Sequence, residues 1–308
     1  MNRQDRAEGA LLGLACGDAL GRPVEFRSPR AIEAEHGTLT EMVGNGTHGK
    51  PAGTVTDDTE QALCIARSLV ERGEFDPADI AERFVAWYND GPFDIGIMTA
   101  DALGRIDDGA SWADAGRDVW EAKPEGSNAG NGSVMRCAPL ALAFADDWEM
   151  LQRTSRDSSR ITHADPRCTH GCAVLNCTIA AMLDGDEQPL TTALDGVSTD
   201  IPDSLVATLE PVPDNVDPDE LQNSGFVLHT LQTALYHALA ADSAEAAIVS
   251  AVNEGGDTDT IGAVAGAVAG ARFGASALPE RWLEILQATD ELRTLARDLS
   301  TLEYGIAR

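Results

Sequence analysis

Residues 255–274 read GGDTDTIGAVAGAVAGARFG. The first six carry two carboxylates and two hydroxyls, and the rest is an apolar helical pattern with glycine at 262, 266 and 270. Residues four apart share one face of a helix, so this run predicts a helix whose glycine face packs closely on a neighbour. Because the apolar part is shorter than the roughly 20 residues of a membrane span, we expect a core helix.

A second glycine series lies near the amino terminus. Residues 8–22 read EGALLGLACGDALGR, with glycine at 9, 13, 17 and 21 and a leucine and alanine stripe. Each glycine costs a helix roughly 1 kcal/mol relative to alanine, so close packing must offset that cost. The pattern again predicts a tightly packed helix. One carboxylate, Asp18, falls in this otherwise apolar helix, and Glu25 follows just after Pro23 in a predicted turn.

The remaining periodicity predicts an all-α bundle of about ten helices, because no convincing period-two segment is present. Residues 38–54 predict a loop that approaches the site, and the acidic, proline-rich residues 184–223 predict short helices and loops. The other helices are expected at 56–70, 77–89, 96–107, 111–121, 134–144, 165–183, 224–240, 243–253 and 279–299.

Composition limits the classes of partner. The chain of 308 residues is 43% apolar but only 5% aromatic, so its core must be built from small aliphatic side chains, which favours helix packing. The formal charge of −29, from 51 acidic and 22 basic residues, argues against nucleic acid as a partner. It fits a solvated surface adapted to a salt-rich cytoplasm, and an acidic residue by itself is therefore no sign of catalysis.

Targeting and cysteine signals are weak. Residues 1–6 lead into mixed sequence without an apolar signal core, so we expect a cytoplasmic protein with no membrane segment. The six cysteines lie mostly in apolar helical patterns and are expected to be free buried thiols. Their spacing matches none of the common zinc patterns, even with the neighbouring histidines included: Cys168, Cys172, Cys177, His163 and His170.

Two clusters of Asp and Thr stand at predicted helix starts, at residues 56–59 (TDDT) and 257–260 (DTDT). Each could be a set of ordinary helix caps, since Asp and Thr oxygens accept the free amide protons of a first turn. One cap needs one residue, however, and the surplus carboxylates repel one another. Hard oxygen donors in this number suit Mg²⁺ or Mn²⁺, and a doubled cluster suits two bridged ions. Both interpretations stay open at this point.

Three further stretches are candidates, each with an ordinary alternative. Residues 130–136 (GNGSVMR) would expose backbone amides at a helix start and suit a phosphate, although a glycine-rich turn alone is weak evidence. His163 stands at a helix entry, where capping or solvent exposure is the ordinary role. Asp94, in the segment FDIG, is equally expected as an N-cap.

Taken in order, these segments resemble the ADP-ribosylglycohydrolase family. The resemblance rests on residues 13–26, 56–59, 130–136, Thr162-His163 with Asp165-Pro166, and 255–260. It implies a compact single-domain orthogonal helical bundle over residues 1–308, with two divalent cations, Mg²⁺ or Mn²⁺, in a cleft. The implied metal ligands are Thr56, Asp57, Asp58, Asp257, Asp259 and Thr260, with Thr59 and Thr258 as supporting donors.

The resemblance also implies a reaction. Glu25 or Asp94 would act as the base in hydrolysis at the ribose anomeric carbon, and the substrate would be held by Gly130, Asn131, Gly132, Ser133 and His163. The expected substrate is an ADP-ribosylated protein, with ADP-ribosyl-arginine ahead of ADP-ribosyl-serine or a small conjugate such as O-acetyl-ADP-ribose. The alternatives are a catalytically silent ADP-ribose-binding relative and a metal-dependent hydrolase of another nucleoside or phosphoester. We expect a monomer.

Overall fold

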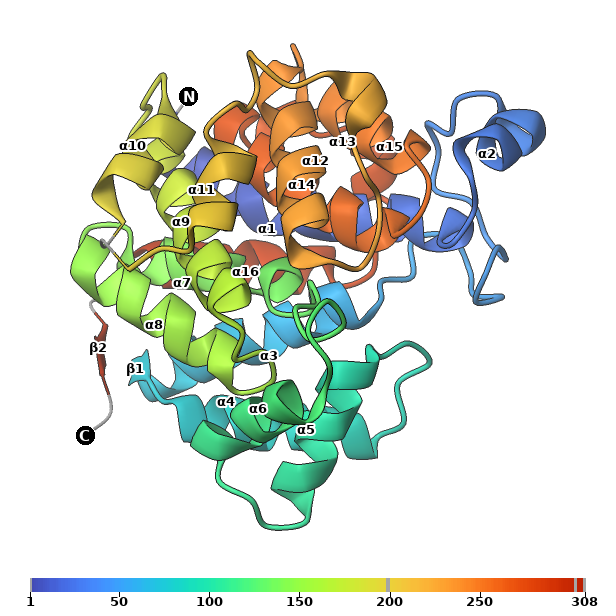
Figure 1. Ribbon diagram of the computed structural model, residues 1–308. Coiled ribbons are helices and arrows are strands. Elements are labelled where there is room, and N and C mark those ends of the chain that lie inside the picture. Colours follow the sequence, from blue (N-terminus) through green and yellow to red (C-terminus); the bar gives the residue numbers. More distant parts are fainter. Residues whose placement is uncertain (1, 198–199, 302–303, 307–308) are drawn as a thin grey trace.

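Two glycine-rich helices, α1 (Arg3–Gly21) and α14 (Thr258–Phe273), pack against each other at the centre of the molecule (Figure 1). The computed structural model describes residues 2–197, 200–301 and 304–306. The helices are antiparallel, since Gly9 lies opposite Gly270 and Gly21 lies opposite Thr258. A methyl group at Gly13 would lie 2.1 Å from the carbonyl oxygen of Gly266. The two backbones therefore touch directly, and the glycine series predicted from the sequence are the two sides of one seam.

The other elements surround this seam, and the all-α prediction is confirmed. Sixteen α-helices occur in the part of the chain that the structure describes. The remaining ones are α2 (Pro29–His36), α3 (Asp57–Arg72), α4 (Pro77–Asn89), α5 (Ile97–Asp107), α6 (Trp112–Ala122), α7 (Ala138–Phe144), α8 (Trp148–Arg160), α9 (Pro166–Leu183), α10 (Pro189–Gly196), α11 (Asp203–Leu209), α12 (Val227–Ala240), α13 (Ala244–Asn253), α15 (Glu280–Leu283) and α16 (Thr289–Thr301).

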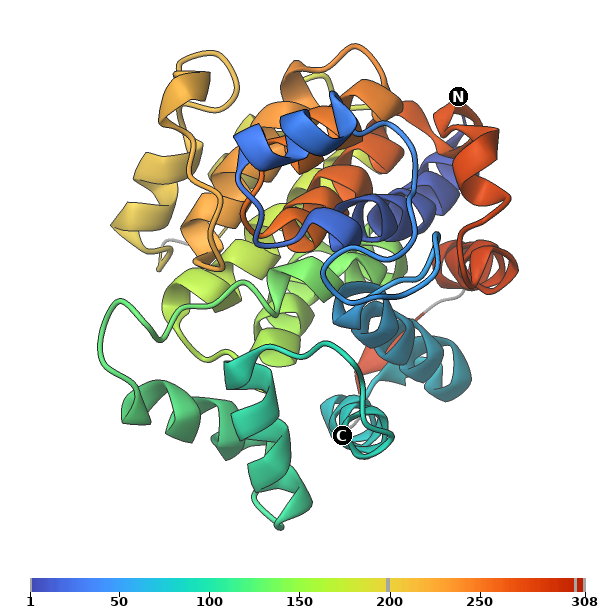
Figure 2. The ribbon, with the colours of Figure 1, turned by 90° about the vertical axis from the view of Figure 1, so that its right-hand side faces the viewer.

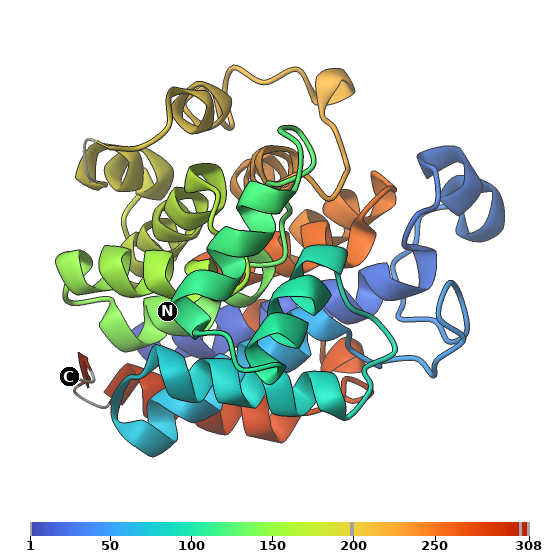
Figure 3. The same cartoon turned by 60° about the horizontal axis from the view of Figure 1, so that its bottom comes forward.

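Short elements complete the fold. Four 3-10 turns are η1 (Arg22–Val24), η2 (Val134–Arg136), η3 (Pro218–Glu220) and η4 (Ala275–Ala277). Two two-residue strands, β1 (Glu74–Phe75) and β2 (Gly305–Ile306), pair in parallel. They bring the carboxyl-terminal end of the described chain beside the segment that joins α3 to α4, at one edge of the molecule (Figure 3).

The helices form one compact body with a lower part made of α4, α5 and α6 (Figures 1 and 3). Helix α9 is buried from Cys168 to Leu183, as its small and apolar sequence predicts. Helix α2 lies at one edge of the molecule in Figure 1 and faces the viewer in Figure 2; the expected loop at 38–54 follows it. None of the described helices is long and apolar enough to cross a bilayer. The core is largely aliphatic, and all six cysteines are buried and free.

Several helix predictions were wrong. Helices α2 and α8 were missed; α8 is rich in polar residues, yet Ser155, Ser158 and Ser159 face the interior. The helix expected at 134–144 is divided into η2 and α7. The one expected at 279–299 is interrupted, because Ala288 takes a left-handed backbone conformation (φ 62°) between α15 and α16. The expected number of about ten was therefore too low.

Candidate functional site

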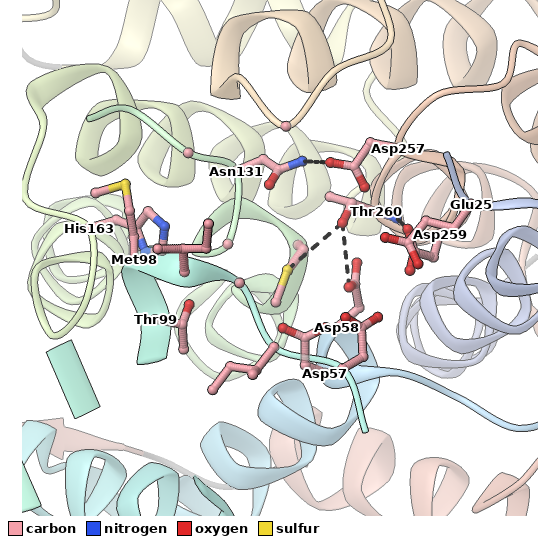
Figure 4. Close-up of a pocket in the computed structure, with 18 of the residues that line it drawn as sticks. Glu25, Asp57, Asp58, Met98, Thr99, Asn131, His163, Asp257, Asp259 and Thr260 are labelled. Carbon is pink, nitrogen blue, oxygen red and sulfur yellow. Dashed lines mark hydrogen bonds between the residues drawn. The ribbon is translucent and has the colours of Figure 1, made fainter. Parts of the chain in front are cut away.

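The two Asp/Thr clusters meet where α3 and α14 begin (Figure 4). The hydroxyl of Thr260 donates a hydrogen bond of 3.4 Å to Asp58 Oδ2, across 202 residues of sequence. The hydroxyl of Thr56, the N-cap of α3, donates to the same oxygen at 3.3 Å. Asp58 thus accepts one hydroxyl from each cluster, and its carboxylate joins the two helix starts.

Asp18 of α1 fixes the start of α3. Its carboxylate is fully buried and accepts hydrogen bonds from the amides of Thr56 (3.0 Å) and Thr59 (3.2 Å) and from the Thr59 hydroxyl (2.5 Å). Burial raises the pKa of Asp18 to about 6, against the effect of these hydrogen bonds. Thr59 is therefore occupied with Asp18, whose glycine-flanked helix carries it to the centre of the molecule.

A tight glycine turn fixes the start of α14. Gly255 and Gly256 have φ values of 73° and 74°, and a methyl group on Gly256 would lie 1.9 Å from the carbonyl oxygen of Asn223. Gly256 accepts a hydrogen bond from the Phe26 amide (2.7 Å) and donates one to the Arg27 carbonyl (2.8 Å). The turn is thereby tied to the segment that carries Glu25.

This turn brings three carboxylates together. Oxygen atoms of Glu25, Asp257 and Asp259 all lie within 4.8 Å of one another. Asp257 is the N-cap residue of α14, yet its side chain makes no capping hydrogen bond. The hydroxyl of Thr258 donates instead to the carbonyl of Gly21, at 2.8 Å. The late cluster is therefore not a set of ordinary caps.

Burial and mutual repulsion raise the pKa values of the acidic side chains. Burial is the largest cause, followed by neighbouring carboxylates, and it raises the pKa of Glu25 to about 9. The pKa values of Asp57, Asp58 and Asp259 are raised well above the usual range for the same reasons. Anionic carboxylates in this arrangement need a cation to offset their charge.

One oxygen of the cluster has no partner. Asp58 Oδ1 is buried and forms no hydrogen bond within the described structure. A buried carboxylate oxygen left unpaired is costly, and coordination of a hard cation would satisfy it. The donor set, made of carboxylates and threonine hydroxyls, also matches what Mg²⁺ or Mn²⁺ prefers. The residues present therefore fit a divalent-metal centre.

The carboxylates form one end of a cavity of about 420 Å³. Its other end is lined by the 130–132 loop, His163, Met98 and Thr99 (Figure 4). Neither lysine nor arginine is among the described residues that line it. Phe26 and Ile97 also line the cavity; at 74% and 75%, they are the most exposed of the large apolar side chains described. The cavity is therefore acidic at one end, neutral and polar at the other, and apolar at two exposed positions.

The glycine-rich loop forms one wall of the cavity. Asn131 donates hydrogen bonds to Asp257 Oδ2 (2.8 Å) and to Thr230 Oγ1 (2.9 Å), which links the loop to the acidic end. The backbone amide of Asn131 donates a hydrogen bond to the carbonyl of Gly225. The turn that follows is the three-residue η2 and not the start of a long helix, so the loop itself, and no helix dipole, would face an anion. Ser133 does not line the cavity, and its hydroxyl accepts from Ser159 at 2.9 Å.

His163 neither caps a helix nor faces solvent. It is 2% exposed, and the N-cap of α9 is Asp165, which accepts from the Arg167 amide. Its Nδ1 lies 2.7 Å from the hydroxyl of Thr162. Burial, and then the charge of Arg136, lower the pKa of His163 to about 3, so the ring is neutral. Both ordinary roles considered for this histidine were wrong.

Asp94 lies beside Glu25 and is not a helix cap, since the N-cap of α5 is Gly96. Burial raises the pKa of Asp94. Between the two carboxyls stands His48, whose Nε2 contacts Glu25 Oε2 and lies 3.6 Å from Asp94 Oδ2. His48 was missed, because it comes from the loop at 38–54, where no periodicity singles out a residue. The structure thus brings the sequence-predicted site residues to one cavity, except Thr56 and Ser133, which are buried behind its lining.

Known proteins match this chain over nearly its whole length. A model of the ADP-ribosylglycohydrolase family matches residues 1–306. The chain is 33% identical to ADP-ribosyl-[dinitrogen reductase] glycohydrolase of Rhodospirillum rubrum, over 97% of this chain and 95% of that protein. It is 34% identical to ADP-ribosylarginine hydrolase Tri1 of Pseudomonas putida, over 96% and 78%. A solved structure, titled ADP-ribosylglycohydrolase-related protein complex, matches with a TM-score of 0.80 and 35% identity, over 98% of this chain and 99% of that one.

Proposed function

The chain belongs to the ADP-ribosylglycohydrolase family of hydrolytic enzymes, and on that premise we propose that it releases ADP-ribose from ADP-ribosylated arginine on a protein. We also propose that it does so with two divalent cations, Mg²⁺ or Mn²⁺, and that residues 1–308 form one domain. The choice of arginine is supported by the relative named as an ADP-ribosylarginine hydrolase. The observation that carries the metal proposal is the junction of two buried acidic clusters at Asp58, one of whose oxygens has no partner.

The side chains that would hold the ions are those of the two clusters: Thr56, Asp57, Asp58, Asp257, Asp259 and Thr260. Divalent cations at such a site supply charge neutralisation and Lewis-acid polarisation of a bound hydroxyl or water. Five of these residues line the cavity, whereas Thr56 is buried behind Asp58 and reaches it through its hydroxyl. Thr56 is therefore the one proposed ligand whose side chain does not line the cavity.

The protein's own groups would perform the proton transfer. Cleavage at the anomeric carbon passes through an oxocarbenium-like state, and a carboxylate must take a proton from the attacking water. We assign this role to Glu25, because its carboxyl lies close to Asp257 and Asp259 on one side and to Asp94 on the other. His48 contacts Glu25 and limits the positions that its carboxyl can take. Asp94 would assist from the cavity wall.

The neutral end of the cavity would hold the ADP part of the substrate. The loop at Gly130, Asn131, Gly132 and Ser133 offers backbone amides, and those of Gly132 and Ser133 have no protein partner among the described hydrogen bonds. His163 lies against the same loop, since a methyl group on Gly132 would lie 2.8 Å from its ring. These groups would bind the diphosphate and ribose oxygens.

The activity is tested by measuring ADP-ribose release from three substrates: ADP-ribosyl-arginine, ADP-ribosyl-serine and O-acetyl-ADP-ribose. Each is incubated with Mg²⁺ or Mn²⁺, and with EDTA as the metal-free control. We expect metal-dependent release that is fastest from the arginine conjugate. Faster release from either other substrate would overturn the linkage. Binding of ADP-ribose without release from any substrate would instead identify a silent relative.

The metal centre is tested with Asp259→Asn, which keeps the size of the side chain and removes its charge. We expect metal affinity and activity to fall together by at least about 100-fold, the upper end of the range for residues that only support a ligand. Asp203→Asn is the matched control, because Asp203 is an exposed aspartate in the first turn of α11. Metal binding is measured by titration with Mn²⁺, and folding by thermal denaturation. Wild-type activity in Asp259→Asn would refute the assignment.

A further inference from the structure

A buried arginine stands behind the cavity and does not belong to its lining. Arg136, in η2, is 1% exposed, and its guanidinium lies 4.4 Å from the ring centre of Phe84. Its two described hydrogen bonds go to neutral groups, the amide of Gln61 and the hydroxyl of Thr162. None of the described ion pairs includes it. Burying a cation without an anionic partner is costly, so the position needs an explanation beyond packing.

The first branch leads to the acidic end of the cavity. Arg136 donates to Gln61 Oε1, and Gln61 Nε2 then donates to Asp57 Oδ2 at 3.2 Å. An amide side chain has a donor end and an acceptor end of nearly the same shape. Because the guanidinium only donates, it fixes which end of Gln61 faces Asp57. Asp57 Oδ2 therefore receives a donor from this side, while the Asp57 carboxyl lines the cavity.

The second branch leads to the neutral end. Arg136 donates to Thr162 Oγ1 at 2.5 Å, and the same oxygen lies 2.7 Å from His163 Nδ1. The Thr162 hydroxyl proton has no other acceptor among the described hydrogen bonds, so it pairs with Nδ1. A neutral histidine whose Nδ1 accepts carries its proton on Nε2. Arg136 thus determines the tautomer of His163 through Thr162.

The Nε2 proton has a place to act. A methyl group built on Gly132 would lie 3.1 Å from His163 Nε2 and 3.2 Å from Thr99 Oγ1, so both polar atoms flank this glycine. Thr99 is 1% exposed, and its hydroxyl has no partner in the described structure. Two buried donors therefore converge beside the glycine-rich loop, and each can donate to an oxygen acceptor that enters the cavity.

We propose that Arg136 is a positioning residue that sets the hydrogen-bond direction at both ends of the cavity, presenting His163 as an Nε2–H donor to a diphosphate or ribose oxygen and Asp57 as an acceptor. The choice of ligand rests on the proposed function, whereas the tautomer of His163 does not. A histidine with the proton on Nδ1 would turn a lone pair toward the anionic ligand and repel it. The contacts of Arg136 with Thr162, and of Thr162 with His163, keep the proton on Nε2 while the ring stays neutral.

The test uses Thr162→Val, which removes the hydroxyl but keeps the shape and leaves Arg136 in the protein. Thr178→Val is the matched control, because Thr178 is fully buried and its hydroxyl donates to Val174 within α9, at 2.8 Å. Thr162→Ser is a second control, because serine keeps the hydroxyl that valine lacks. The tautomer of His163 is read from the ¹⁵N chemical shifts of the labelled ring, and affinity from titration with ADP-ribose in the presence of Mg²⁺.

We expect the wild type, Thr178→Val and Thr162→Ser to show the Nε2–H form. In Thr162→Val, the His163 ring should lose its preference for the Nε2–H form. This variant should bind ADP-ribose roughly tenfold more weakly, which is the effect of losing one hydrogen bond to a charged acceptor. Its Mn²⁺ affinity should be unchanged, since the Gln61 branch is intact. A wild-type ring that carries its proton on Nδ1, or a Thr162→Val variant with the wild-type tautomer and affinity, would overturn the proposal. If wild-type protein fails to bind ADP-ribose while its ring shows the Nε2–H form, the ligand assignment fails and the relay stands.

Discussion

The contact of α1 with α14 leads to a quantitative prediction for Gly13→Ala. A methyl group there would lie 2.1 Å from the Gly266 carbonyl oxygen. Carbon and oxygen atoms without a bond prefer about 3.5 Å, so the helices must separate by roughly 1.4 Å. Both atoms concerned are fixed to backbone, and no rotamer change can relieve the contact. We therefore expect the upper end of the overpacking range, about 3 kcal/mol of unfolding free energy.

This loss is measured by urea denaturation and thermal unfolding of the metal-free protein. A change of about 3 kcal/mol lowers Tm by roughly 5 °C in a chain of this size. The matched control is Gly104→Ala in α5, where the nearest atom to the added methyl is Tyr88 Oη at 3.8 Å. Relief of glycine's backbone entropy should stabilise that variant by about 0.5–1 kcal/mol. Equal stability of Gly13→Ala and wild type would refute the reasoning about the seam.

Three further predictions concern charge. The pKa of Glu25 is raised to about 9 in the folded protein, against an ordinary value of 4.5. Between these two pH values the folded metal-free protein therefore binds more protons than the unfolded chain. Its Tm should therefore fall as pH rises from 5 to 9; a rising Tm in EDTA would contradict this, and Glu25→Gln should flatten the slope. Asp18→Asn should destabilise the protein by about 2 kcal/mol and weaken Mn²⁺ binding, since it presents an amide donor toward the Thr56 and Thr59 amides; unchanged Mn²⁺ affinity would separate Asp18 from the site. With a net charge of −29, the protein should unfold at low ionic strength and gain stability toward molar KCl; stability that is independent of salt would remove the halophilic interpretation.

The sequence indicated the elements of the fold better than their partners. Both glycine series were visible as closely packing faces, but each was interpreted alone, since a period of four says how near a neighbour comes and not which helix it is. Helix α8 was missed because its inward-facing serines have the polarity of a surface. The break at Ala288 depends on a left-handed residue that is not glycine, for which the local sequence carries no signal.

In the candidate site, too, local sequence patterns could be predicted and contacts between distant residues could not. The acidic clusters could be singled out because several carboxylates stand together within four residues, which is more than helix capping requires. His48 and Gln61 could not, because each is a single polar residue whose role comes from a partner distant in the sequence, Glu25 for His48 and Arg136 for Gln61. Thr162 stood in a motif, but its contact with Arg136 was not visible. Arg136 was part of a motif but was not interpreted, since its burial depends on Phe84 and on both hydrogen-bond acceptors.

The central seam also sets an order of events during synthesis. Gly21 and Thr258, which close one end of the seam, are 237 residues apart in the chain. At about 5–20 residues per second, the ribosome delivers α14 roughly 10–50 s after α1. For that interval the glycine face of α1, the helix that carries Asp18, lacks the helix on which it packs most closely. The nascent chain therefore acquires its active arrangement only after residues 258–273 emerge.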